Sequence, residues 1–276
     1  MPKLIDLIEE QLLILLEAEE TSPEAEKELQ DILGDSYPEF VAKLGQNITD
    51  PKFRAAIKSL ADKNPIQTTD ISAPVKNLKP TQNEIDVDKS LKFPLTNVAS
   101  AEGLLKGGTV AIAGKKIVTG GGGEFIIDGH HRWSQAYVTN PEVKLAALDL
   151  SNIKNPMDGL KATQLGIAGD IGKVPTQSVQ GSNLLTMGEA ELKKYVIDTT
   201  TDEVLEVFKK YQKGDSKEAV ANYIWNNVKE MQSNNQPVSG APKRDIMPQT
   251  DTAPDWEADA AVPVAESIFP LWNKIK

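Results

Sequence analysis

Hydrophobic positions recur with a helical period over the first 64 residues of the chain. Residues 3–20 are apolar around most of a helical circumference, which is more than one packing face requires. Ser22 and Asp50 each stand before a proline at the start of a further helix, and Gly34 ends the first of these helices. We therefore expect an N-terminal helical region, residues 1–64, that either stabilises the chain or docks a partner protein.

Residues 71–150 carry short β-prone runs in place of the helical period. The polar stretch at 62–74, which is bounded by prolines, predicts a linker, and residues 75–78 predict a first strand. The runs on either side of Gly114 predict a hairpin, and residues 141–150 predict a final strand. These runs predict an α+β fold in which a small mixed sheet lies between helical regions.

Four successive glycines, residues 120–123, interrupt the β-prone runs. In a phosphate-binding P-loop such glycines lie between a strand and a helix and precede Lys-Ser or Lys-Thr, whereas here a strand follows them. The glycine run therefore predicts the tip of a hairpin, which could still close over a ligand.

The predicted strand at residues 124–127 passes directly into a helix at Asp128-Gly129. Beyond this point apolar residues recur with helical spacing from Trp133 onward. The first backbone N–H groups of such a helix have no partners within the helix and point at whatever lies above the turn. This turn is therefore a candidate site for an anion such as phosphate.

The side chains of the turn also suit phosphate. Gly129 lets the backbone approach a ligand closely, and Arg132 can hold two phosphate oxygens as a fork. His130 and His131 add hydrogen-bond donors, and they are the only 2 histidines in the chain. Their placement side by side favours a functional role for at least one. The alternative is that one caps the helix or packs in the core while the other is solvated.

The remainder of the chain is helical and then polar. Residues 151–232 predict a C-terminal helical region, in which Thr186 and Thr200 each begin a capping-box sequence. Residues 233–276 predict a flexible tail, because the segment up to residue 255 is too polar to fold alone. The apolar residues that follow predict a segment that docks either on the core or on a partner.

Composition limits the classes of function. The chain has 276 residues, of which 39% are hydrophobic, and it contains no cysteine, which excludes disulfides and thiolate metal sites. The longest apolar run, residues 12–16, is too short to cross a membrane, and the N-terminus is a poor secretory signal. We therefore expect a cytoplasmic protein without a membrane partner. The net charge of −10 disfavours nucleic acid as a partner.

The order of strand, Asp-Gly-His-His-Arg-Trp, helix and strand resembles the ParB/sulfiredoxin-like domain over residues 71–150. The signature of that superfamily is a Gly-x-x-Arg turn followed by a helix, here Gly129 to Arg132. This variant is most similar to ATP-dependent free serine kinases and to stand-alone ParB-like proteins of bacteriophages. The resemblance implies a ParB/sulfiredoxin-like fold with a small mixed sheet or partial barrel.

The resemblance also implies a function, namely nucleotide binding with Mg²⁺ and either phosphoryl transfer or nucleotide hydrolysis. ATP or CTP would be the nucleotide, and a small hydroxyl-bearing molecule would be the acceptor of a kinase. Glu84, His130 and His131 are the candidate catalytic residues, although Glu84 could simply favour a helix start. Asp128 and Glu84 are the candidate metal ligands. The residues expected to hold the phosphates are Asp128, Gly129, His130, His131 and Arg132.

Two other functions are compatible with the sequence. One is a non-enzymatic accessory or virion protein of a bacteriophage, located in the host cytoplasm or the virion. It would use the ParB-like domain as a scaffold and the terminal helices for self-association or a protein partner. The other is a ParB-like nuclease, which the acidic net charge disfavours. Nucleotide binding tests the first alternative, and DNA cleavage that is lost in His130→Ala or His131→Ala would support the second.

Overall fold

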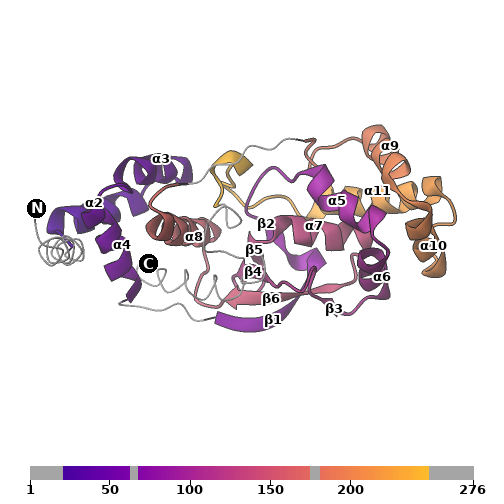
Figure 1. The fold of residues 1–276 in the computed structure, drawn as a ribbon, viewed down its shortest axis with the longest axis horizontal. Coiled ribbons are helices and arrows are strands. Elements are labelled where there is room, and N and C mark those ends of the chain that lie inside the picture. Colours follow the sequence, from indigo (N-terminus) through magenta and orange to yellow (C-terminus); the bar gives the residue numbers. More distant parts are fainter. Residues whose placement is uncertain (1–20, 63–67, 175–180, 249–276) are drawn as a thin grey trace, which may run out of the picture.

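Helices lie at both ends of an elongated molecule, and a mixed sheet lies between them (Figure 1). The computed structural model describes residues 21–62, 68–174 and 181–248 of the chain. Within these residues the fold is α+β, as the sequence predicts. The sheet has 6 strands, which pair both parallel and antiparallel, and it is not closed. The helix predicted at residues 3–20 lies outside the described residues.

The N-terminal end of the molecule is a group of helices. The hydroxyl of Ser22 accepts a hydrogen bond from Ala25 N at 3.1 Å at the start of the first helix, and Gly34 ends that helix as predicted. The apolar faces of these helices meet α8 (Pro156–Ile171) in one buried core, which we call the helical cluster. The N-terminal helices are α2 (Pro23–Leu33), α3 (Tyr37–Asn47) and α4 (Pro51–Asp62).

The sheet runs through the middle of the molecule. Its strands are β1 (Thr68–Pro74), β2 (Lys79–Pro80), β3 (Thr109–Val110), β4 (Ile117–Gly120), β5 (Phe125–Asp128) and β6 (Lys144–Leu150). Strand β6 is central, because it pairs antiparallel with β1 and parallel with β4 and β3. Strand β5 pairs parallel with β2 and antiparallel with β4. The glycine run joins β4 to β5, so the predicted hairpin tip is confirmed.

The central strands of the sheet pack against buried cores on both faces, because successive residues of a strand point to opposite sides. On one side Ile126 and Ala147 belong to a core that also contains residues of α7 (His130–Thr139). On the other side Ile127 and Leu148 share a core with a residue of α8. The sheet therefore separates α7 from α8.

Among the described residues, five further helices lie on the same side of the sheet as α7, three of them in contact with α7 and two packed on those three. They are α5 (Val87–Thr96), α6 (Val98–Lys106), α9 (Glu189–Thr199), α10 (Asp202–Lys210) and α11 (Lys217–Asn234). The predicted group of C-terminal helices packs on α7 through α11, whose Asn227 and Tyr223 donate to backbone carbonyls of α7 at 2.8 and 2.9 Å. None of the helices in the described parts of the chain is long and apolar enough to cross a membrane.

Three local predictions in the sheet region are wrong. Residues 68–74, predicted as part of a linker, form β1, because β6 supplies backbone hydrogen bonds that a polar sequence does not indicate. The strand predicted at 75–78 is instead the 3₁₀ helix η1 (Val75–Asn77). The hairpin predicted around Gly114 is reduced to an isolated bridge, since β3 and β4 each pair with β6.

Helix α8 runs through Gly169, where a Cβ would lie 3.2 Å from Ile57 Cγ2, so this glycine permits close packing on α4. Two helix starts differ from the prediction, because the capping boxes predicted at Thr186 and Thr200 are displaced. Helix α9 begins after Gly188, and α10 begins after Thr201, whose hydroxyl accepts from Val204 N at 3.3 Å.

Residues 235–248, predicted as part of a flexible tail, lie against the folded protein and include the 3₁₀ helix η2 (Arg244–Ile246). We call residues 235–248 the C-terminal strap. Met247 of the strap is buried in the helical cluster. Contacts with other parts of the chain therefore hold the strap in place, although the composition of the strap does not predict folded structure. The docking segment predicted within residues 249–276 lies outside the described residues.

Candidate functional site

Strand β5 passes into α7 through a turn with glycine at its corner. Gly129 has a φ of +97°, in the left-handed region, and a Cβ there would lie 2.6 Å from Ile117 Cγ2. One turn later, Trp133 is fully buried and its ring Nε1 donates to Val75 O at 2.9 Å. Packing on both sides therefore sets the backbone of the turn at residues 128–132.

Arg132 folds back over this turn. Its guanidinium donates from Nη2 to Asp128 Oδ2 at 2.6 Å and from Nη1 to Lys116 O at 2.5 Å. The side chains of Arg132 and Asp128 are 17% and 27% exposed, so the pair is partly accessible from solvent. In this conformation the predicted phosphate-binding guanidinium holds a carboxylate, which has the same sign of charge as phosphate and a similar fork of oxygens.

His130 lies beneath the turn and is 5% exposed. Its Nε2 accepts a hydrogen bond from Thr81 N at 3.1 Å, and Thr81 Oγ1 donates to Ile126 O at 2.6 Å. Because Nε2 is an acceptor, the ring is neutral and its proton is assigned to Nδ1. Burial lowers the pKa of His130 well below its usual value. His130 thus joins α7 to the loop after β2, and its contact with phosphate stays a prediction.

His131 has different surroundings from its neighbour. Its Nε2 is buried and has no hydrogen-bond partner among the described residues. Burial, followed by the positive charges of Arg244, Lys89 and Arg132, lowers the pKa of His131 to about 3. Three cations therefore lie around a neutral ring in the first turn of α7, where the helix itself contributes partial positive charge.

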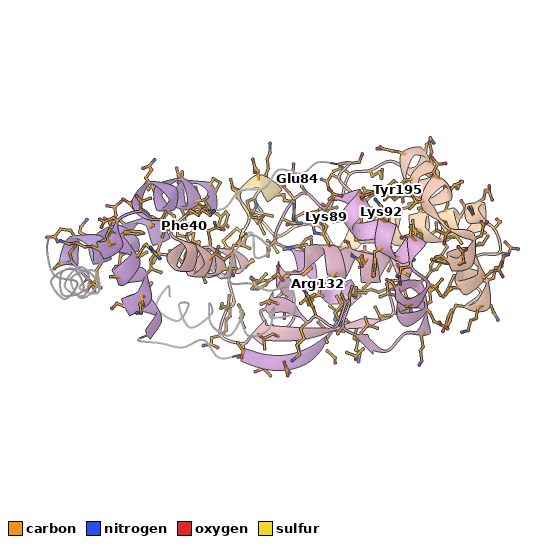
Figure 2. All side chains as sticks on the ribbon, viewed as in Figure 1. Phe40, Glu84, Lys89, Lys92, Arg132 and Tyr195 are labelled. Atoms are coloured by element: carbon orange, nitrogen blue, oxygen red, sulfur yellow. The ribbon has the colours of Figure 1, made fainter. Side chains whose placement is uncertain are left out.

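Figure 2 labels Glu84, Lys89 and Arg132 in the middle of the molecule. Lys89 is exposed on α5 and lies between Glu84 and Arg132 in this view, in the middle of the molecule. Lys92 lies further along α5, toward α9. Gln135 Nε2 donates to Lys89 O at 3.0 Å, which ties α7 to α5.

Two buried amides near the turn have unused hydrogen-bonding capacity. Gln82 is 1% exposed and Gln135 is 8% exposed. Gln82 Nε2 and Gln135 Oε1 have no partner within the part of the chain that the structure describes. Gln82 follows Thr81, which contacts His130, and Gln135 lies one helical turn after His131. Such atoms cost about 1–3 kcal/mol each when they stay unpaired, so they mark places that a ligand or water completes.

The two predicted metal ligands have other partners. Glu84 Oε2 accepts a hydrogen bond from Arg244 N at 2.9 Å, and Asp128 pairs with Arg132. The described residues contain no group of three or more His, Asp or Glu side chains placed to hold a metal ion. These residues therefore do not form an all-protein metal site. The role of Glu84 and Asp128 toward Mg²⁺ stays a prediction, since an ion bound to nucleotide phosphates needs only one or two carboxylates.

Four residues around the turn have no counterpart in the sequence prediction, namely Gln82, Lys89, Gln135 and Arg244. Gln135 could have been found, because it lies one helical turn after His131 and so shares its helix face. Lys89 and Arg244 resemble any other surface cation in the sequence. Arg244 lies in a segment whose composition predicts no fold.

Comparison with known proteins finds no family model, no curated protein and no solved structure that matches this chain. The interpretation of the site therefore depends on the residues of the turn, on their geometry and on the resemblance of the motif.

Proposed function

We propose that the 128–132 turn binds the phosphates of a nucleotide, in a domain with the ParB/sulfiredoxin-like fold and a sheet of partial-barrel form. The observation that carries the proposal is the positive charge that Lys89, Arg132 and Arg244 exert on the buried His131 at the start of α7. The chain as a whole has a net charge of −10, so positive charge at this turn is a local feature. A local positive site in an acidic protein suits a small anion better than a nucleic-acid backbone.

Phosphate binding would require Arg132 to exchange its present partner. The guanidinium now donates to Asp128 Oδ2 and to Lys116 O. A phosphate carries more charge than a carboxylate and offers a matching fork of oxygens, so it can compete for the same donors. We propose that the carboxylates of Asp128 and Glu84 bind the Mg²⁺ that accompanies a nucleotide.

The proposed reaction is phosphoryl transfer to a small hydroxyl-bearing acceptor or hydrolysis of the nucleotide. His131 is better suited than His130 to accept a proton, because the Nε2 of His130 already accepts from Thr81 N. With a pKa of about 3, His131 alone is a weak base. The negative charge of a bound phosphate would raise that pKa toward the neutral range.

Calorimetric titration of the full-length protein with ATP, CTP and GTP in the presence of Mg²⁺ tests the proposal. We expect at least one nucleotide to bind, and Lys89→Gln to weaken its binding by about tenfold, because a charge-assisted contact is lost. Lys92→Gln is the matched control. It makes the same change on the same helix, but Lys92 pairs with Asp88 at 3.6 Å, so affinity should not change.

Arg132→Ala should abolish most of the binding, and Arg132→Lys should retain part of it, because a lysine keeps the charge but not the fork. Equal affinities in the wild type, Lys89→Gln and Arg132→Ala would contradict a phosphate site at this turn. If no nucleotide binds and the protein co-purifies with a larger particle, the accessory or virion function is favoured instead.

A further inference from the structure

The C-terminal strap crosses the molecule from the end of α11 to the helical cluster. At its start Asn235, 2% exposed, donates from Nδ2 to two backbone carbonyls of the segment between β1 and β2, each at 2.8 Å. At its end Met247 is buried in the helical cluster, and Tyr37 OH donates to Ile246 O at 3.2 Å. The strap is therefore anchored at both ends.

Between these anchors, the strap is hydrogen bonded to the loop that follows β2. Backbone hydrogen bonds of 3.0 Å join the strap to Pro80, the last residue of β2, and to Asn83 of the loop. Arg244 N then donates to the carboxylate of Glu84 at 2.9 Å. The same loop contains Thr81, whose N–H donates to His130. One short loop thus holds both the strap and the first histidine of the motif.

This loop links the backbone of Arg244 to the 128–132 turn, because its Glu84 accepts from Arg244 N and its Thr81 N–H donates to His130. The positive charge of Arg244 contributes to the lowered pKa of His130 and of His131, so it acts on both rings of the motif. The loop also contains Gln82, which is 1% exposed and whose Nε2 has no partner among the residues described. A guanidinium presents its donors in a planar fork that matches two phosphate oxygens.

We infer that Arg244 is a phosphate-binding residue of this site, carried there by the C-terminal strap, and that Glu84 is the positioning residue that fixes its backbone. The inference rests on the proposed function, and its ligand is the phosphate group of a nucleotide. Glu84 then acts through Arg244 and is not the general base that the family resemblance implies. The site is completed by a segment whose own sequence shows no sign of folding.

The test is titration of the full-length protein with ATP and Mg²⁺, or with CTP or GTP if one of these binds more tightly. Arg244→Gln should weaken binding about tenfold, and Arg244→Lys should recover part of the loss. Lys243→Gln is the matched control, because Lys243 is the neighbouring cation on the strap and is exposed. Its affinity should stay within about twofold of wild type, since an exposed charge is screened by salt. The melting temperature of each variant checks that it is folded.

Glu84 is tested by a pair of variants. Glu84→Gln keeps a side-chain oxygen that can accept from Arg244 N, whereas Glu84→Ala does not. In titrations without Mg²⁺, which leave out the proposed metal role of Glu84, we expect Glu84→Ala to weaken nucleotide binding about fivefold and Glu84→Gln to restore it, because the strap needs only an acceptor at this position. Equal loss of binding in the two variants would overturn the positioning role.

The outcomes separate this inference from the proposed function. A wild-type protein that binds none of the three nucleotides overturns both. Binding that depends on Lys89 and Arg132 but is unchanged in Arg244→Gln overturns the role of Arg244 alone. Binding that falls in Arg244→Gln and not in Lys243→Gln supports it.

Discussion

The helical cluster and the 128–132 turn both contain buried polar side chains, but these side chains differ in how many hydrogen bonds they form. In the helical cluster, Lys161 is 6% exposed, and its Nζ donates to Leu33 O at 2.7 Å and to Asp35 O at 2.6 Å. The ammonium also lies 5.8 Å from the centre of the Phe40 ring, at the N-terminal end of the molecule in Figure 2. The acceptors of Lys161 Nζ lie at the C-terminal end of α2 and in the turn after it, where the helix dipole also stabilises a cation.

At the 128–132 turn, three buried polar atoms lack hydrogen-bond partners. His131 Nε2, Gln82 Nε2 and Gln135 Oε1 have no partner within the described residues. A buried polar group that is fully paired joins parts of a fold, whereas buried atoms with unused capacity lower stability unless something else binds them. The paired ammonium of Lys161 is therefore structural, and the three unpaired atoms at the turn support the proposed ligand site. The helical cluster also contains an unpaired amide, Gln164 Nε2, which serves below as a control.

The largest expected effect is on the stability of the protein and comes from a substitution in the helical cluster. Lys161→Met keeps the packing of the side-chain stem but leaves two backbone carbonyls without their ammonium donor, so we expect the free energy of unfolding to fall by about 3 kcal/mol. Urea denaturation followed by circular dichroism measures this change. Nucleotide affinity should not change, because Lys161 lies in the helical cluster and not at the turn.

Lys43→Met is the control for this substitution. Lys43 forms an ion pair with Asp35 at 2.7 Å while 47% of its side chain is exposed, so its loss should cost no more than about 0.5 kcal/mol. Equal effects of Lys161→Met and Lys43→Met would contradict a structural role for the buried lysine.

The second prediction concerns pH and His131. Its pKa is about 3 in the folded protein and about 6.5 in the unfolded chain, so the unfolded chain binds the proton first as pH falls. The stability that depends on a neutral His131 is therefore complete above about pH 6.5 and is lost progressively below it, by about 2 kcal/mol at pH 5. Denaturation at pH 7 and pH 5 measures the loss, and His131→Phe should reduce the difference between the two.

The histidine titrations can also be followed directly by NMR, because the chain has only 2 histidines. Without ligand, both rings should remain neutral down to at least about pH 5. Addition of ATP and Mg²⁺ should raise the pKa of His131 more than that of His130, because His131 Nε2 has no partner among the described residues. A pKa near 6.5 for both rings in the free protein would contradict their buried positions.

The third prediction separates two roles of Asp128. If the Asp128 carboxylate mainly competes with phosphate for the Arg132 guanidinium, Asp128→Asn should strengthen ATP binding about threefold, because the phosphate then displaces a neutral amide instead of a carboxylate. If Asp128 instead holds Mg²⁺, the same substitution should weaken binding in Mg²⁺. Calorimetry with and without Mg²⁺ distinguishes these results. Asp70→Asn, which removes a partly exposed ion pair with Lys116, is the control for the change in charge.

The smallest expected effect concerns the unpaired amides. Gln82→Leu removes a buried amide nitrogen without a partner among the described residues, so we expect the free energy of unfolding to rise by up to about 1 kcal/mol while nucleotide affinity falls. Gln164→Leu is the matched control in the helical cluster, where Gln164 is fully buried and its Nε2 is likewise unpartnered in the described chain. Its substitution should leave affinity unchanged. Loss of affinity in both variants would contradict a specific role for Gln82.

The sequence by itself determined those elements whose signals lie within a few residues of one another. The start of α2 at Ser22 and its end at Gly34 follow from local capping chemistry, and the glycine run at 120–123 marks the connection of β4 to β5. The change from a strand to a helix at Asp128-Gly129 is also local, because the two periods of apolar residues meet there.

Only the tertiary structure decided which distant segments meet. Residues 68–74 are a strand because β6 lies beside them, and α8 packs with the N-terminal helices although it follows the sheet in sequence. The turn likewise receives Lys89 from α5 and Arg244 from the C-terminal strap. A strand pairing and a cluster of charges depend on contacts between residues far apart in the chain, and each of these residues is ordinary in its own local sequence.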